Sequence, residues 1–187
     1  DAPIGALRGD RLILRDQSAR RTIAGGEVVD PFSPKRGRAK PERLAHLAAM
    51  AEPTEQTSFA ALLRHHTTGL DLQQFALAWN LTKVEADEVF ASTEFQNLSA
   101  RSGDWGLADD HWRTLQTSLL ASITDFHARQ PDLLGPSEDM ISRSMSPRYP
   151  LDVARAGLQS LLSEGKLSRQ GTAFHLPDHE AQPTDDD

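Results

Sequence analysis

The chain has 187 residues, of which 38% are hydrophobic and 25% are charged, so it is long enough for one or two small domains with cores of their own. It contains no cysteine, which excludes disulfides, thiolate metal sites and a cysteine nucleophile and suits a reducing cytosol. No apolar run approaches the roughly 18 to 20 residues that a membrane span needs, and Asp1-Ala2-Pro3 does not resemble a signal peptide. We therefore expect a cytoplasmic protein with no membrane partner.

Charge is distributed unevenly along the chain, whose net charge is −7. Residues 1–43 contain ten Lys and Arg against six acids, a net charge of +4, which leaves −11 for the remainder. Nonspecific nucleic-acid binding depends on Lys and Arg that neutralise phosphates. An acidic remainder therefore argues against broad phosphate binding by the folded modules.

The N-terminal residues predict a β-hairpin. Residues 12–14 and 22–29 are short apolar runs, and residues 16–19 form a turn between them. Because a lone two-stranded hairpin is marginal in water, we expect residues 1–34 to close a larger β-domain.

The residues of this hairpin resemble the closing hairpin of the third, β-barrel domain of translational GTPases related to elongation factor Tu. The segments Asp16-Gln-Ser-Ala-Arg-Arg-Thr22, Asp30-Pro-Phe32 and Lys35-Arg-Gly-Arg38 are most similar to those of selenocysteine-specific elongation factors. The resemblance is specific over residues 8–45.

Residues 35–41 are basic and are bounded by prolines, which predicts a linker, and helices follow it. Apolar residues recur at helical spacing in residues 42–50 and 57–66. Asp71 with Gln74, and Thr82 with Glu85, are spaced as N-caps of two further short helices. A small hairpin over residues 95–107 completes a first module, residues 42–108.

A similar order of helices and a hairpin recurs about seventy residues later. An amphipathic helix spans residues 109–129, Ser137 caps a short helix, a third helix follows Pro150, and residues 166–176 predict two strands. This pattern is typical of winged helices. We predict a mainly α fold with small β-hairpins: tandem winged-helix domains, 42–108 and 109–177, preceded by a residual β-barrel hairpin and followed by a disordered acidic tail, 178–187.

The resemblance implies a noncatalytic fragment of a larger factor, whose GTPase part holds selenocysteyl-tRNA and whose last winged helices bind a messenger-RNA hairpin on the ribosome. No Gly-x4-Gly-Lys-Ser/Thr loop is present, so we assign no catalytic residue and no cofactor to this chain; GTP and magnesium belong to the implied parent. The histidines, including His65-His66 and His175-x3-His179, lack further converging ligands, and we predict no metal site.

Basic side chains are the candidates for RNA phosphate contacts, against the alternative that they only keep the surface soluble. The eight candidates are Lys35, Arg36, Arg38, Lys40, Arg143, Arg148, Arg155 and Arg169. The recognition helix expected after Thr82 is acidic, so we expect weak or no nucleic-acid binding by this chain alone. A tandem winged-helix DNA-binding transcription regulator and a protein-interaction scaffold are the alternatives. Trp79 and Trp112 lie on apolar helical faces, which favours core packing over base stacking.

Overall fold

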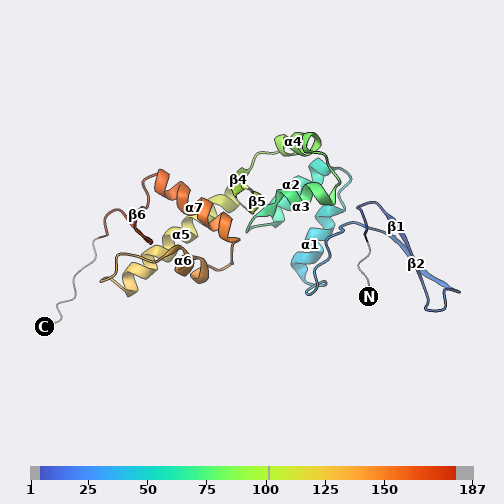
Figure 1. The fold of residues 1–187 in the computed structure, drawn as a ribbon, viewed down its shortest axis with the longest axis horizontal. Helices are drawn as coiled ribbons and strands as arrows, with labels where there is room; N and C mark the ends of the chain where they lie inside the picture. Colours follow the sequence, from blue (N-terminus) through green and yellow to red (C-terminus); the bar gives the residue numbers. More distant parts are fainter. Residues whose placement is uncertain (1–4, 101, 180–187) are drawn as a thin grey trace. The chain divides into compact units, whose positions relative to one another are not determined.

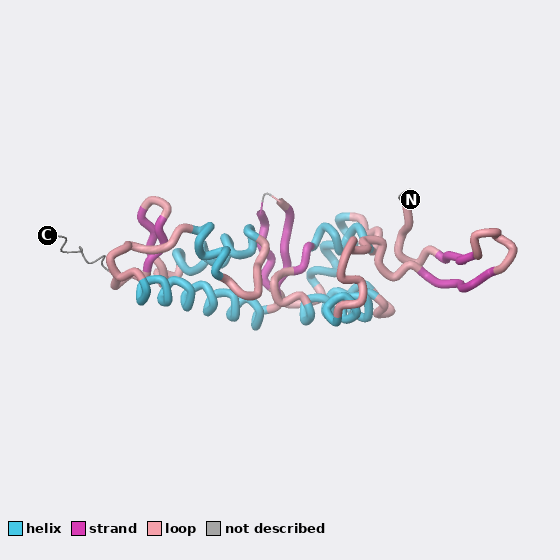
Figure 2. Tube along the Cα trace, turned by 90° about the horizontal axis from the view of Figure 1, so that it is seen from below, coloured by secondary structure: helices cyan, strands magenta, loops and turns pink. Residues whose placement is uncertain are grey.

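The computed structural model describes residues 5–100 and 102–179. Its elements are mainly helices with short antiparallel hairpins, as predicted (Figures 1 and 2). Two compact units can be distinguished. The first comprises Asp1–His66 and Leu70–Glu94, and the second comprises Thr67–Gly69 and Phe95–Asp187.

The predicted N-terminal hairpin is present as strands β1 (Arg11–Arg15) and β2 (Thr22–Glu27), drawn in blue in Figure 1. The carboxylate of Asp16 closes its turn by accepting the backbone N–H of Arg20 at 2.9 Å. Every residue of both strands is exposed, including Ile13 and Ile23, which are 67% and 66% exposed. Neither apolar side chain therefore gains the stabilisation that burial would provide.

Four helices form the rest of the first unit. They are α1 (Pro41–Met50), α2 (Glu55–His65), α3 (Leu72–Ala78), which follows the short strand β3 (Leu70–Asp71), and α4 (Lys83–Ala91). The predicted caps are present, because the Asp71 carboxylate accepts the Gln74 N–H and Thr82 forms a capping box with Glu85. The fully buried Phe59 packs against Phe75 and Phe90 at the centre of the core.

The second unit contains three helices and two hairpins. Its elements are β4 (Gln96–Ala100), β5 (Gly103–Leu107), α5 (Asp109–Arg129), α6 (Glu138–Ser144), α7 (Leu151–Ser163), β6 (Ser168–Gln170) and β7 (Ala173–His175). Ser137 caps α6, and Gly165 adopts a φ of 69° after α7, both at the predicted positions. Leu115, Leu119 and Leu158 are buried between α5 and α7. The order from α5 to β7 is that of a winged helix with β6 and β7 as its wing.

Two features differ from the sequence-based prediction. The β4–β5 hairpin, which we assigned to a first module ending at residue 108, groups with the second unit because Leu107 is fully buried in that core. His179, in the predicted disordered tail, stacks on His127 with ring centroids 3.6 Å apart and contacts the Leu133 carbonyl. Ordered packing therefore reaches residue 179, and the rest of that predicted tail lies outside the described residues.

Candidate nucleic-acid interface

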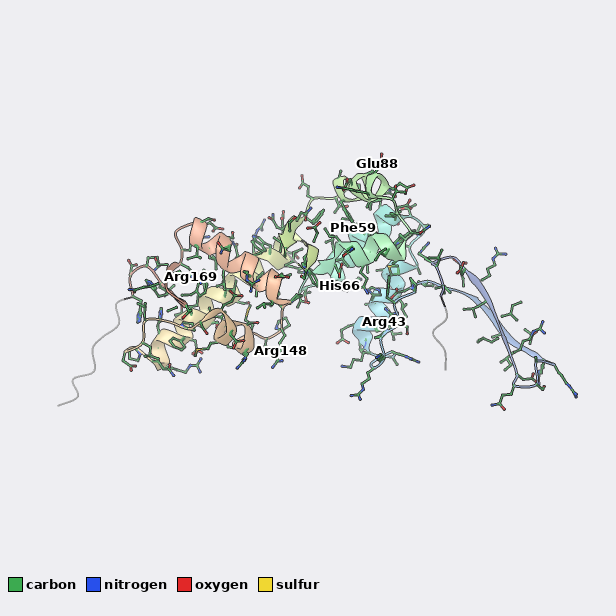
Figure 3. All side chains as sticks on the ribbon, in the orientation of Figure 1. Arg43, Phe59, His66, Glu88, Arg148 and Arg169 are labelled. Carbon is green, nitrogen blue, oxygen red and sulfur yellow. The ribbon has the colours of Figure 1, made fainter. Side chains whose placement is uncertain are left out.

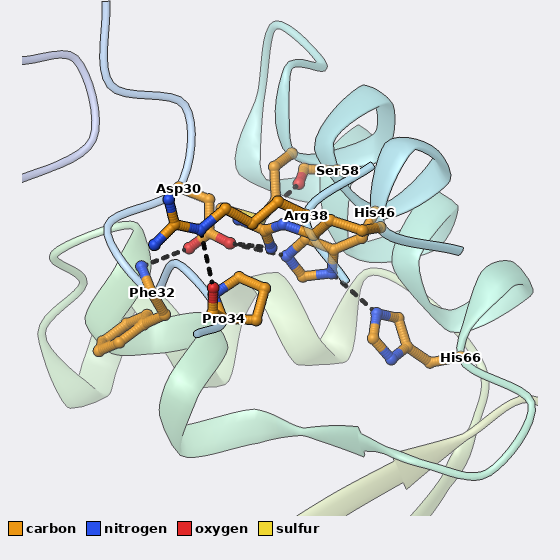
Figure 4. A network of polar contacts seen from close by, with 9 residues as sticks. Asp30, Phe32, Pro34, Arg38, His46, Ser58 and His66 are labelled. Carbon is orange, nitrogen blue, oxygen red and sulfur yellow. Dashed lines mark hydrogen bonds and ion pairs between the residues drawn. The ribbon is translucent and has the colours of Figure 1, made fainter. Parts of the chain in front are cut away.

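A buried carboxylate organises the chain around the first set of basic residues (Figure 4). Asp30, whose side chain is 3% exposed, accepts hydrogen bonds from Arg43 Nη1 at 2.5 Å and His46 Nε2 at 3.1 Å, both from α1. Its second oxygen accepts the Phe32 N–H at 2.8 Å. The other ring nitrogen of His46, Nδ1, lies 2.9 Å from the Nε2 atom of His66 at the end of α2. These contacts join the end of the hairpin segment to two helices.

The environment of this cluster shifts the pKa of two groups. Burial is the strongest influence on Asp30 and would raise its pKa, but hydrogen bonds from His46, the Phe32 N–H and Arg43 together lower the pKa to about 2. Burial, with His46 and His65 nearby, lowers the pKa of His66 to about 4. At neutral pH, Asp30 is therefore ionised and His66 is neutral.

The first set of candidate residues lies between Asp30 and α1. Lys35, Arg36, Arg38 and Lys40 are all exposed, and none of them forms an ion pair within the part of the chain that the structure describes. The Arg38 Nε donates to the Pro34 carbonyl at 3.2 Å, and the Lys40 N–H donates to the Gly37 carbonyl at 3.1 Å. The four cations are therefore exposed on one short segment, residues 35–40.

The second set is dispersed, and much of its charge is compensated. Arg143 pairs with Asp139 at 2.8 Å, and Arg155 pairs with Glu138 at 2.7 Å and Asp152 at 3.1 Å. The hydrogen bond to Glu138 is the main reason why the pKa of Arg155 is raised. These two arginines would have to exchange carboxylates for phosphates before they could bind RNA.

The other two arginines of the second set lie well apart (Figure 3). Arg169, on the wing strand β6, donates to the Gly171 carbonyl at 2.9 Å and lies over the Phe174 ring. Arg148, in the segment between α6 and α7, is exposed and has no ion pair with a described residue. Among the described residues, Arg148 is therefore the one arginine of this set whose charge has no intramolecular partner.

The acidic character of the first recognition helix is visible in the structure. Glu85, Asp87 and Glu88 of α4 are exposed together with a single cation, Lys83. Glu88 is labelled on this helix in Figure 3. An exposed acidic helix repels a nucleic-acid backbone, so α4 does not provide a duplex-binding surface.

The described residues form neither a metal-binding cluster nor a membrane-spanning helix. Among residues 5–100 and 102–179, no group of three or more His, Asp or Glu side chains is arranged to hold a metal ion. No described helix is both long and apolar enough to pass through a lipid bilayer. Trp112 is half-buried and packs on the second core, as its position on an apolar face predicted. Trp79 is half-buried beneath the guanidinium of Arg8, which lies 3.5 Å from its ring centroid.

Comparison with known proteins supports the resemblance seen in the hairpin. Residues 1–35 match the β-barrel domain of the selenocysteine-specific elongation factor, and residues 120–176 match the winged helix of elongation factor SelB. The chain is 30% identical over 182 residues to the selenocysteine-specific elongation factor of Escherichia coli (strain K12) and 28% identical over 184 residues to that of Haemophilus influenzae. The chain belongs to the selenocysteine-specific elongation factor family.

The similarity to both members of this family covers 97% of the chain but only 29% of each relative. The chain thus spans under a third of the length of these selenocysteine-specific elongation factors. The winged-helix match begins within α5 and ends just after β7, so it covers the second half of α5, the helices α6 and α7, and the wing of the second unit. The match to the barrel domain includes β1, β2 and Asp30.

Sequence reasoning found the exposed cations but missed the residues that position them. The sequence places Asp30 in a segment similar to the family's and indicates no role for Arg43 or His46, and for His66 it indicates only surface or cap hydrogen bonding. Their partners lie 13 to 20 residues apart along the chain, across a turn whose path no local pattern specifies. The one available signal was an aspartate before a proline, which is typical of a turn that the carboxylate stabilises.

Proposed function

We propose that this chain is a noncatalytic spacer and coupling region of a longer selenocysteine-specific elongation factor. In this proposal it connects the GTPase part that carries selenocysteyl-tRNA with winged helices that bind a messenger-RNA hairpin during selenocysteine incorporation on the ribosome. The observation that supports it best is the β1–β2 hairpin. Its apolar side chains are exposed, it matches the family's barrel domain, and it continues into helical modules.

The proposed role is mechanical. Arg8, just before β1, donates to the carbonyls of Met50, the last residue of α1, and of Glu52 just beyond it. Asp30, just after β2, binds Arg43 and His46 within α1. Both ends of the hairpin are thereby attached to the first helical unit. A hairpin held at two points transmits position, whereas a flexible linker would not.

In this proposal, GTP and magnesium are bound elsewhere in the factor, and this chain binds neither. Its affinity for nucleic acid is weak and independent of sequence, because α4 is acidic and Arg155 of α7 is already paired with carboxylates. The same two features weigh against a DNA-binding transcription regulator, whose recognition helices need free cations. A cytoplasmic location follows from the proposed work on the ribosome.

Binding assays on the isolated chain test whether GTP binding and hairpin recognition belong to other parts of the factor. We expect no saturable binding of GTP in calorimetry, and weak binding of an RNA hairpin in gel shifts that disappears steeply as salt increases. Tight binding of duplex DNA would support the transcription regulator instead. Sequence-selective hairpin binding near physiological salt would mean that these winged helices are themselves the recognition modules.

The mechanical role is tested in the full-length factor with a reporter gene that contains a selenocysteine codon. A flexible Gly-Ser insertion after Asp10 interrupts the segment between Arg8 and β1 without removing a side chain. We expect reduced readthrough with unchanged GTP hydrolysis by the factor alone. The same insertion in the exposed turn after Ser18, at the far end of the hairpin, is the control. Equal readthrough by both variants would contradict a coupling role.

A further inference from the structure

The basic segment after the hairpin is a closed loop. Asp30 stands immediately before it, and the two side chains that bind the Asp30 carboxylate, Arg43 and His46, stand immediately after it in α1. The chain therefore leaves this cluster at residue 31 and returns to it at residue 43. We call residues 31–42 the basic loop, and the contacts of Asp30 with Arg43 and His46 the clamp. Figure 4 labels Asp30 and His46 of the clamp, and Phe32, Pro34 and Arg38 of the loop.

The basic loop is ordered by its own contacts. The Phe32 N–H donates to Asp30, the Arg38 side chain donates to the Pro34 carbonyl, and the Lys40 N–H closes a turn on the Gly37 carbonyl. Prolines at positions 31, 34 and 41 restrict φ at three further points. A loop of this kind loses less conformational entropy on binding a ligand than an open linker of the same length.

The charges of the basic loop are available to a ligand. Its four cations are exposed and without ion pairs among the described residues, and the only acid within it, Glu42, lies at its end in α1. The neighbouring carboxylate, Asp30, is buried and already bound to Arg43 and His46, so it does not neutralise the loop from outside. Four clustered cations attract an extended polyanion more strongly than a single phosphate, because each neutralised phosphate releases counterions.

We propose that the basic loop is a pre-organised binding site for the phosphodiester backbone of RNA, and that Asp30 is the positioning residue that holds the loop closed. The choice of RNA as the polyanion rests on the proposed function. Lys35, Arg36, Arg38 and Lys40 contact phosphates without reading bases, which suits a loop with no exposed base-stacking aromatic other than Phe32 among its described residues. The clamp acts only through the loop, since Asp30 itself is buried.

The substitution Asp30→Ala distinguishes this site from a simple patch of charge. Removal of a negative charge should tighten RNA binding if only net charge matters. If the clamp matters, the same variant should bind RNA more weakly, by roughly three- to tenfold, because the loop must be ordered at each binding event. Glu42→Gln is the matched control, since it removes one exposed negative charge at the end of the loop and leaves the clamp intact.

The measurement is fluorescence anisotropy of a labelled uridine homopolymer and of a labelled RNA hairpin of unrelated sequence, each over a range of salt. Loop opening is followed separately by the rate of trypsin cleavage after Lys35 and Arg36. We expect Asp30→Ala to be cleaved faster and to bind both RNAs more weakly, and Glu42→Gln to be cleaved at the wild-type rate and to bind at least as tightly. Unchanged cleavage, or tighter binding by Asp30→Ala, would overturn the role of the clamp.

A second variant tests the site itself even if Asp30→Ala fails to fold. Replacement of Lys35, Arg36, Arg38 and Lys40 by glutamine alters only exposed side chains, and it should weaken binding of both RNAs alike and flatten the salt slope by up to about one unit per lost contact. RNA binding that is unaffected by this variant, or no RNA binding by the wild-type chain even at low salt, would overturn the proposal and leave the spacer role standing. Selective binding of the family's own hairpin would instead contradict the proposed function.

Discussion

The guanidinium of Arg8 lies 3.5 Å from the centroid of the Trp79 ring. The same side chain donates to the carbonyl oxygens of Met50 and Glu52 at 3.1 Å. Carbonyls at the end of a helix lack intrahelical partners, so Arg8 satisfies acceptors at the end of α1 while its flat face covers the aromatic ring. The segment before the hairpin is in this way attached to two helices of the first unit.

Replacement of Arg8 by alanine should lower the free energy of unfolding of the first unit by about 1 to 3 kcal/mol, because it removes the cation–π contact and three hydrogen bonds to two backbone carbonyls. Arg8→Lys should recover only part of this loss, since an ammonium group cannot make the same forked contacts. Urea unfolding followed by circular dichroism measures both. Arg11→Ala, on the exposed strand β1, is the control and should change stability by less than about 0.5 kcal/mol. An equal effect at both positions would contradict an anchoring role for Arg8.

Ionised Asp30 should stabilise the fold above the pKa of an unfolded aspartate. Its pKa falls from 3.8 to about 2 on folding, so this contribution is complete above pH 3.8 and is lost as the pH falls towards 2. Its size is about 2 kcal/mol. Asp30→Asn should lower stability at neutral pH and flatten the pH dependence between pH 4 and 2, which urea unfolding at successive pH values will show. Asp87→Asn, on the exposed face of α4, should leave the profile unchanged.

His66 should make the stability of the first unit depend on pH between 6.5 and about 4, above the range in which Asp30 acts. Burial favours its neutral form, so its pKa falls from 6.5 to about 4 on folding, and the unfolded chain binds the extra proton between these values. The contribution of neutral His66 to stability is therefore fully present above pH 6.5. The free energy of unfolding declines by up to about 3 kcal/mol as the pH falls to 4. His66→Gln should flatten this decline, whereas the neighbouring His65→Gln, which removes only the last of the three influences on the His66 pKa, should flatten it much less. A wild-type profile that is level over this range would refute the assignment.

Local devices of the fold could be predicted from the sequence. Asp71 and Thr82 cap helices whose free N–H groups lie three residues further on, so the residues that interact are close in the chain. Apolar residues at helical spacing indicate the long helix α5, and Gly165 marks the end of α7 before the wing. The part of the second unit from α5 to β7 was therefore recognisable as three helices and a hairpin.

Relations between distant segments could not be predicted in this way. The β4–β5 hairpin follows α4 in the chain, but Leu107 is buried among residues of α5 and α7, and no local pattern says which core takes it. The positive charges of Arg143 and Arg155 were evident from the sequence, but the pairing of Arg155 with Glu138 depends on how α6 packs on α7. The clamp at Asp30 could not be predicted for the same reason, because it forms only when the basic loop returns to α1.

Close packing at Gly135 leads to the last prediction. A Cβ atom at this position would lie 2.0 Å from the carbonyl oxygen of Phe174, which belongs to the backbone of the wing strand β7 and cannot rotate away. Phe174 is buried, and its N–H donates to the Pro136 carbonyl at 3.0 Å, so the wing is held against residues 135–136.

Gly135→Ala should therefore displace the wing and destabilise the second unit by about 1 to 3 kcal/mol. Gly25→Ala, where the added Cβ would meet only the Leu12 carbonyl oxygen at 3.8 Å, is the control and should have little effect. Amide hydrogen exchange will locate the change: faster exchange at Phe174 with unchanged exchange in α2 is the expected result, and full protection at Phe174 in the variant would show that the wing does not pack on Gly135 in solution.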